Sequence, residues 1–197
     1  MTITDQSTVR TSETAVPIVG LLSERWSPRS YDPSATISDE QLTALLEAAR
    51  WAPSAANLQP RRFVVGRRGT ATFETILKNL VGFNSAWAGN AAALVVAIAE
   101  TSTEEGDERR WAEYDLGAAL SALSVQAHAE GLHTHQMGGF EVDGIRAAFE
   151  LPERLVPVTV TAVGVVDSAD KLPEQLAERE TLPRTRLSLD ELVLVRD

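Results

Sequence analysis

Two short segments of the chain carry arginines at a spacing that suits a phosphate group. In Arg-Trp-Ser-Pro-Arg, the side chains of Arg25, Ser27 and Arg29 alternate, and alternate side chains of an extended segment share one face. A guanidinium fork beside a hydroxyl and a second guanidinium suits a phosphate with an attached polyol. Arginines that follow a helix also bond its C-terminal carbonyls, so the segment alone leaves both interpretations open.

The second segment lies near the other end of the sequence. Arg184 and Arg186 flank a single threonine between Pro183 and Leu187, so they too can face one anion. The alternative is a solvated positive pair on an otherwise acidic surface.

Two further segments can meet the polar edge of a heterocycle. Residues 53–60, Pro-Ser-Ala-Ala-Asn-Leu-Gln-Pro, offer one hydroxyl and two amides between prolines, although the same residue types build ordinary turns. Met137-Gly-Gly-Phe140 places two glycines after an expected strand. Paired glycines let a backbone approach a ligand closely and aim N–H groups at it, but they also form tight turns.

Composition limits the chemistry available to these residues. The chain has 197 residues, 28 acidic and 18 basic, with a net charge of -10 and no cysteine. Disulfides, thiolate metal sites and cysteine nucleophiles are therefore excluded, and the negative charge disfavours nucleic acid as a partner. The longest apolar run, 91–99, is too short to span a membrane, and the start lacks the pattern of a signal peptide. We expect a cytoplasmic protein with a flexible tail at 1–16 and one domain at 17–197.

Helices and strands that could position the four segments alternate along the sequence. Hydrophobic periodicity and two capping boxes, at Ser38–Gln41 and Ser188–Glu191, predict the elements. The expected helices are 17–25, 38–51, 70–79, 109–131, 142–149 and a turn after 188. The expected strands are 63–65, 91–99 (a helix remains possible there), 133–137 and 156–166, and 167–183 is expected to be an extended connection. This order predicts an α+β sheet flanked by helices.

The expected helix at 109–131 has a composition that calls for burial on every side. No charged residue occurs from Leu116 to Ala127, and many side chains there are small. A helix that is apolar all round must be covered all round. A subunit interface would achieve this in so small a protein; the alternative is a central helix in a monomer core.

Taken together and in this order, the segments resemble the nitroreductase family of FMN-dependent oxidoreductases. The resemblance rests on Arg-x-Ser-x-Arg-x-Tyr at 25–31, Pro-Ser-x-x-Asn-x-Gln-Pro at 53–60, Met-Gly-Gly-Phe at 137–140 and the C-terminal Arg-x-Arg. It spans about residues 17–190. It implies a mostly antiparallel central sheet flanked by helices, an intertwined homodimer and one FMN in each of two interface pockets.

The resemblance also implies a role for each site residue. Arg25, Ser27, Arg184 and Arg186 would hold the phosphate, and Arg29 would reach the ribityl chain and the pyrimidine edge, which Asn84 would also bond. Backbone N–H groups of Gly138 and Gly139 would meet the flavin. Pro53, Ser54, Ala55 and Asn57 would come from the other subunit, with Gln59 supporting their loop. Trp26, Gln136 and Met137 complete the expected cofactor-binding set.

The implied activity is hydride transfer from NADPH or NADH to FMN and on to a nitroaromatic, quinone or similar flat acceptor. The flavin performs this chemistry, so we expect no catalytic side chain and no metal, with Arg29 tuning the flavin electrostatically. Alternatives are a flavin-storing or flavin-sensing protein, or a dehalogenase or dehydrogenase on the same scaffold.

The chain departs from the family pattern in three places. Arg61 and Arg62 follow Pro60 where tryptophan is common, Trp87 replaces a lysine of some relatives, and Gln136 replaces a proline. These changes affect the expected potential, acceptor and nicotinamide preference. We expect Trp26, Trp51, Trp87 and Trp111 to be packing anchors, with Trp87 a candidate for lining the substrate pocket. His133 and His135 share a strand face but lack an evident third metal ligand.

Overall fold

The computed structural model describes residues 10–197 of the chain. Residues 1–9 of the tail expected at 1–16 therefore lie outside the described residues. Within the remainder of that segment, the Ser12 amide donates to the Ser23 carbonyl at 2.8 Å. This part of the segment therefore lies against the domain.

The centre of the fold is a four-stranded sheet in the order β1-β2-β4-β3, with every neighbouring pair antiparallel. The strands are β1 (Arg61–Arg67), β2 (Ala93–Glu100), β3 (His133–Met137) and β4 (Leu155–Gly164). Every residue of β2 is buried, because the strand is central and covered on both faces. This burial explains its uninterrupted apolar run and rules out the helical alternative for 91–99.

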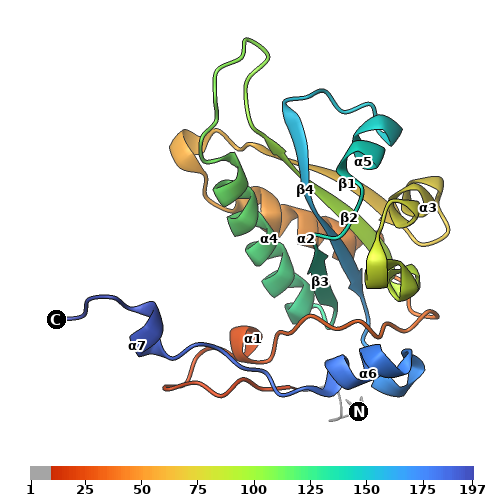
Figure 1. The fold of residues 1–197 in the computed structure, drawn as a ribbon. Helices are drawn as coiled ribbons and strands as arrows, with labels where there is room; N and C mark the ends of the chain where they lie inside the picture. Colours follow the sequence, from red (N-terminus) through yellow and green to blue (C-terminus); the bar gives the residue numbers. More distant parts are fainter. Residues whose placement is uncertain (1–9) are drawn as a thin grey trace.

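Helices cover both faces of the sheet (Figure 1). α2 (Asp39–Trp51) and α4 (Ala112–Ala129) cover one face, and α3 (Ala71–Lys78) and α5 (Val142–Ala148) cover the other. The remaining helices are α1 (Gly20–Ser23), α6 (Glu174–Thr181) and α7 (Leu189–Leu192), and α7 lies away from the sheet (Figure 1). Val95 packs on the side of α2 and α4, whereas Val96 packs with Phe73 of α3 and Ile145 of α5. Neighbouring residues of a strand point to opposite faces, so β2 supplies two cores. The predicted α+β class and mostly antiparallel sheet are confirmed.

Both predicted capping boxes form. Ser38 Oγ accepts from the Gln41 amide at 3.1 Å, and the Gln41 side chain accepts from the Ser38 amide at 3.1 Å. These reciprocal bonds satisfy two donors that a helix start would leave open. A second box, between Ser188 and Glu191, begins α7.

The segment 167–183 is not the extended connection that we predicted. It contains α6, a helix of 8 residues. Leu176 packs into the core beside α3 and α5, and Glu180, four positions later, accepts two backbone N–H groups. Residues four apart lie on one helix face, so these tertiary contacts select a helix in a segment whose local composition indicated a loop.

Two other helices differ from expectation. The first helix is limited to Gly20–Ser23 instead of 17–25, and Ile18, Leu21 and Leu22 are 40–48% exposed. Without a packed apolar face, a short helix gains little beyond its costly nucleus. In α4, Leu116 and Leu123 are buried, but Gly117 is exposed. The single chain therefore leaves part of this helix uncovered, and the subunit interface that would cover it stays a prediction.

Candidate functional site

The two predicted arginine segments meet at one cavity of about 330 Å³. Arg25, Ser27 and Arg29 line it from the segment after α1, and Arg184 and Arg186 line it from the segment after α6. Nη2 of Arg184 donates to the Arg25 carbonyl at 2.7 Å, across 159 positions of sequence. The other lining residues are Arg10, Trp26, Arg179, Glu180, Leu182, Pro183 and Thr185. We call this space the arginine cavity.

The carboxylate of Glu180 holds one wall of the arginine cavity in place. It is almost fully buried and accepts from the Arg29 amide at 2.6 Å and the Ser30 amide at 3.0 Å. The Arg29 guanidinium approaches the same carboxylate at 3.5 Å. Glu180 was not among the predicted site residues. The four-residue spacing of Leu176 and Glu180, which places both on one face of a helix, was the signal that could have indicated it.

Arg184 and Arg25 play different parts. Arg184 donates to the Ser23 carbonyl at 2.9 Å and to the Arg25 carbonyl, and it also contacts the Arg10 carbonyl. It therefore binds carbonyls at the end of α1, a role that was raised for the arginines of 25–29, whereas the alternative for Arg184 was a solvated positive pair. The Arg25 side chain makes no hydrogen bond to any described residue. The structure therefore shows carbonyl binding for Arg184, and the anion-binding role of Arg25 stays a prediction.

The electrostatics of the arginine cavity suit an anion. Partial burial, and then the nearby Arg186, lower the pKa of Arg25 from its ordinary value. Burial followed by Arg25, Arg186 and Arg10 lowers the pKa of Arg184. Positive charges held close together in this way are destabilised until an anion joins them. The only carboxylate among the described lining residues is Glu180, which is already bonded, so a phosphate group fits the residues present.

A second cavity, of about 270 Å³, lies beside the first and shares Arg25 with it. Gln136 of β3 lines this cavity, as do Ser124 and the exposed Gly117 of α4. The Gln136 amide lies 3.4 Å from Ser124 Oγ. A ligand anchored at the arginine cavity could therefore extend along β3 and α4.

Two histidines of β3, His133 and His135, remain uncharged near neutral pH. Burial lowers the pKa of His133 to about 4, with contributions from His128 and Arg25. Burial likewise lowers the pKa of His135 to about 4. Its Nδ1 lies 2.9 Å from the Pro28 carbonyl, which can only accept, so this nitrogen carries the proton.

The predicted glycine segment follows β3. The Asn84 side chain donates to the Gly139 carbonyl at 3.1 Å. A Cβ on Gly139 would lie 2.8 Å from Asn84 Nδ2, whereas a Cβ on Gly138 would meet nothing within 4 Å. A side chain at 139 would therefore displace the Asn84 amide, whereas one at 138 would not. Met137 is 2% exposed and packs into the core, which leaves only its backbone for a ligand.

The loop 53–60 has a strained backbone. Ala56, Asn57 and Gln59 have φ values of 48°, 56° and 49°, a region that costs a non-glycine residue about 1–3 kcal/mol. The buried Asp115 of α4 accepts from the Ala55 amide at 3.1 Å. Gln59 donates from its backbone to Ser54 Oγ and from its side chain to the Asn57 carbonyl, both at 3.1 Å. Gln59 thus supports the loop, as expected.

This loop does not meet the arginine cavity within one chain. It lines a separate cavity of about 420 Å³ through Pro53, Ser54 and Ala55, opposite Trp111 and Tyr114. Figure 1 places the end of α2, where the loop begins, and α6 at opposite ends of the domain. In the single chain the residues of this loop therefore form a second group apart from the arginine cavity, and Asn84, Met137, Gly138 and Gly139 line neither cavity.

The tryptophans are not all packing anchors. Trp26 and Trp87 are buried, but Trp51 and Trp111 are 75% and 51% exposed, so the prediction is wrong for this second pair. Trp87 is enclosed in the core, where it stacks on Tyr31 with centroids 6.0 Å apart. It therefore does not line a substrate pocket. Trp26 lines the arginine cavity, and its buried Nε1 finds no acceptor among residues 10–197.

Two further properties of the described residues bear on other classes of protein. Across 10–197, histidine, aspartate and glutamate side chains form no group of three that could hold a metal ion. Over the same residues, none of the helices has the length and apolar character needed to cross a membrane.

Known proteins share both this sequence and this fold. The Nitroreductase family profile matches residues 22–78 and 66–165. The "Uncharacterized 15.4 kDa protein in ask 5'region" of Mycolicibacterium smegmatis is 36% identical over 141 residues, which cover 66% of this chain and 92% of the relative. The "Putative NAD(P)H nitroreductase YodC" of Bacillus subtilis is 29% identical over 178 residues, 73% of this chain and 87% of the relative.

A solved structure described as an oxidoreductase containing FMN has the same architecture. It superposes with a TM-score of 0.87 at 34% identity and covers 92% of this chain and 93% of its own. Sequence profile, relatives and fold agree, and this chain belongs to the Nitroreductase family.

Proposed function

We propose that the protein is an FMN-dependent oxidoreductase that uses NADH or NADPH to reduce nitroaromatics, quinones or similar flat acceptors in a ping-pong cycle. The observation that carries the proposal is the arginine cavity, where Arg25, Arg29, Arg184 and Arg186 converge from distant parts of the sequence. The FMN of the similar solved structure and the NAD(P)H in the relative's name support this assignment.

The arginines and the serine of the arginine cavity would bind different parts of FMN or hold the backbone around it. Arg25, Ser27 and Arg186 would bond the FMN phosphate, and Arg184 would add positive charge while it holds the Ser23 and Arg25 carbonyls. Arg29, fixed by Glu180, would lie toward the pyrimidine edge and stabilise negative charge there. Bound FMN would supply a hydride acceptor at N5 and a flat surface for the second substrate. Protons would come from water or substrate.

The second group of site residues supports a homodimer as the working form. Pro53, Ser54 and Ala55 line a cavity that shares no residue with the arginine cavity. A second copy would bring its loop 53–60 to the flavin held by the first, and the exposed side of α4 around Gly117 would lie at the interface. Each of the two FMN molecules would then contact both subunits.

Anaerobic reduction tests the activity. The purified protein should be yellow, and NADH or NADPH should bleach the flavin visible band within seconds, with colour returning when a nitroaromatic or quinone is added. An Arg50→Ala variant is the matched control, because Arg50 is exposed and pairs with Glu47 away from the arginine cavity. Persistent colour with both donors would indicate a flavin-storing or flavin-sensing protein, and failure to bind FMN would refute both functions.

A further inference from the structure

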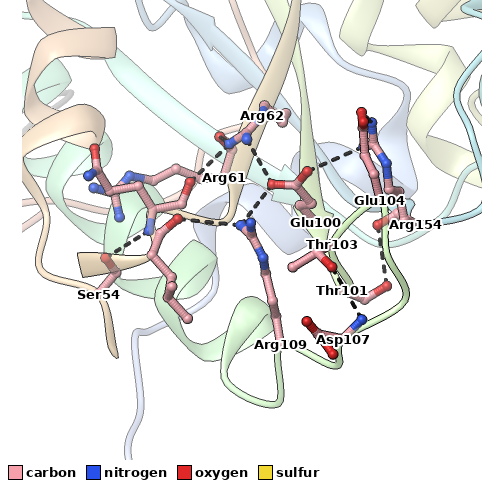
Figure 2. Close-up of polar contacts among 12 residues, drawn as sticks. Ser54, Arg61, Arg62, Glu100, Thr101, Thr103, Glu104, Asp107, Arg109 and Arg154 are labelled. Atoms are coloured by element: carbon pink, nitrogen blue, oxygen red, sulfur yellow. Dashed lines mark hydrogen bonds and ion pairs between the residues drawn. The ribbon is translucent and has the colours of Figure 1, made fainter. Parts of the chain in front are cut away.

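Glu100, the last residue of β2, is a buried carboxylate contacted by three arginines (Figure 2). Its Oε2 lies 2.7 Å from Arg62 Nη2 and 2.8 Å from Arg109 Nη1. Its Oε1 lies 3.3 Å from Arg154 Nη1. We call these four residues the Glu100 cluster. A buried carboxylate requires such partners, but three guanidinium groups exceed what a single charge needs.

The three arginines differ in what else they touch. Arg62 Nη1 donates to the Gln59 carbonyl at 2.9 Å, and Arg109 Nη1 lies 3.4 Å from the Leu58 carbonyl. Arg154 instead pairs with Glu104 at 2.6 Å. Two arginines of the Glu100 cluster, Arg62 and Arg109, therefore contact the loop 53–60. The third, Arg154, contacts the exposed Glu104 instead.

The backbone of Glu100 also holds this loop, because its amide donates to the Pro60 carbonyl at 2.7 Å. Three consecutive carbonyls, at positions 58 to 60, are thus bonded from Glu100 or from arginines that Glu100 fixes. They adjoin the residues at positive φ, Ala56, Asn57 and Gln59. A strained backbone of this kind persists only where surrounding contacts over-determine it.

We propose that Glu100 is a positioning residue for flavin binding. By fixing Arg62 and Arg109, its carboxylate holds the Leu58 and Gln59 carbonyls and keeps the loop 53–60 in the shape that presents Ser54, Ala55 and Asn57 to the flavin of the partner subunit. The inference rests on the proposed function, because it requires that the loop 53–60 binds the FMN of the partner subunit. Glu100 itself would touch neither cofactor nor substrate. It also gives a specific task to Arg62, one of the two arginines that follow Pro60 where tryptophan is common in the family.

The test compares Glu100→Gln with Arg154→Gln. Glu100→Gln keeps the size of the side chain and removes the charge that orients Arg62 and Arg109. Arg154→Gln removes an arm of the same cluster that has no contact with the loop. Two quantities are measured on each purified protein: the FMN dissociation constant, from fluorescence quenching, and amide hydrogen exchange at Ala55, Asn57, Leu58 and Gln59, whose N–H groups are all bonded in the structure.

Glu100→Gln should raise the FMN dissociation constant by about tenfold or more, as expected when charge-assisted bonds are lost. It should also speed exchange of the loop amides while the β2–β4 amides keep wild-type rates. Arg154→Gln should change the dissociation constant by less than about twofold. Equal effects of the two variants, or wild-type binding and loop exchange in Glu100→Gln, would overturn the proposal.

A second variant decides the matter if Glu100→Gln does not fold. Arg62 is 47% exposed, so Arg62→Gln leaves the fold intact and Arg109 and Arg154 still neutralise Glu100. It should weaken FMN binding and speed exchange at Gln59; unchanged values would overturn the positioning role. If wild-type protein binds no FMN, the proposed function fails. If wild type binds FMN and these variants bind it equally well, only the role of Glu100 fails.

Discussion

Replacing Arg25 with alanine should separate cofactor binding from folding. Arg25 lines the arginine cavity but makes no side-chain hydrogen bond to residues 10–197, and its pKa is lowered by burial and by Arg186. A positive charge with a lowered pKa is destabilised in the folded protein at every pH below that pKa. Arg25→Ala should therefore leave the flavin-free protein at least as stable as wild type.

The same substitution should weaken FMN binding strongly. A hydrogen bond to a charged group contributes about 1.5–3 kcal/mol, which corresponds to roughly a 10- to 150-fold increase in the dissociation constant. Fluorescence titration of flavin-free protein measures this increase, and urea unfolding of the same preparation measures stability. Double replacement of Arg25 and Arg186 should release FMN while retaining most secondary structure.

Arg184→Ala is the matched comparison, because Arg184 lines the same cavity but donates to the Ser23 and Arg25 carbonyls. It should lower the free energy of unfolding by about 1–3 kcal/mol even without FMN. Equal loss of stability in Arg25→Ala and Arg184→Ala would contradict the division of tasks between them. An FMN affinity within twofold of wild type in Arg25→Ala would refute the assignment of the phosphate site.

Three other results are expected. Because His133 and His135 have pKa values of about 4 in the fold, against about 6.5 when unfolded, the unfolded chain binds more protons between these values. Stability should therefore fall as pH drops through this window, by on the order of 1 kcal/mol per partly exposed histidine. Urea unfolding at pH 7 and at pH 5 measures the change in the free energy of unfolding. His135→Asn should reduce the dependence of this free energy on pH. An unchanged dependence in the variant would contradict the contribution assigned to His135. Glu180→Ala should destabilise the protein by about 2–4 kcal/mol, because it removes the acceptor of two backbone N–H groups. Replacing the exposed Glu178 with alanine should change the free energy of unfolding by no more than about 0.5 kcal/mol. Equal changes in the two variants would exclude an anchoring role for Glu180. A leucine at Gly117, where a Cβ meets nothing within 4 Å in the single chain, should convert a dimer to a monomer in light scattering, and a dimer of wild-type mass would show that this part of α4 is not the interface.

Local sequence signals predicted the helices and strands well where the physical cause was itself local. The capping boxes at Ser38 and Ser188 form as expected because their partners are three residues away. The apolar run 91–99 indicated a buried strand, although a helix was also possible, and the structure has β2 inside the sheet. By contrast, α6 was missed because its helix is selected by distant contacts: Leu176 needs the core, and Glu180 needs the amides of Arg29 and Ser30.

The sequence by itself determined which residue types could hold a phosphate and that Arg25, Ser27 and Arg29 could share a face. It also carried the motifs that place the chain in its family. Only the tertiary structure decided that Arg184 meets Arg25 across 159 positions, with Arg184 bonding carbonyls and the Arg25 side chain without a hydrogen bond to residues 10–197. It also decided that Trp87 is buried and Trp111 exposed, and that Glu100 gathers three arginines beside a strained loop. Charge pairing and burial depend on distances in space, which residue spacing along the chain does not specify.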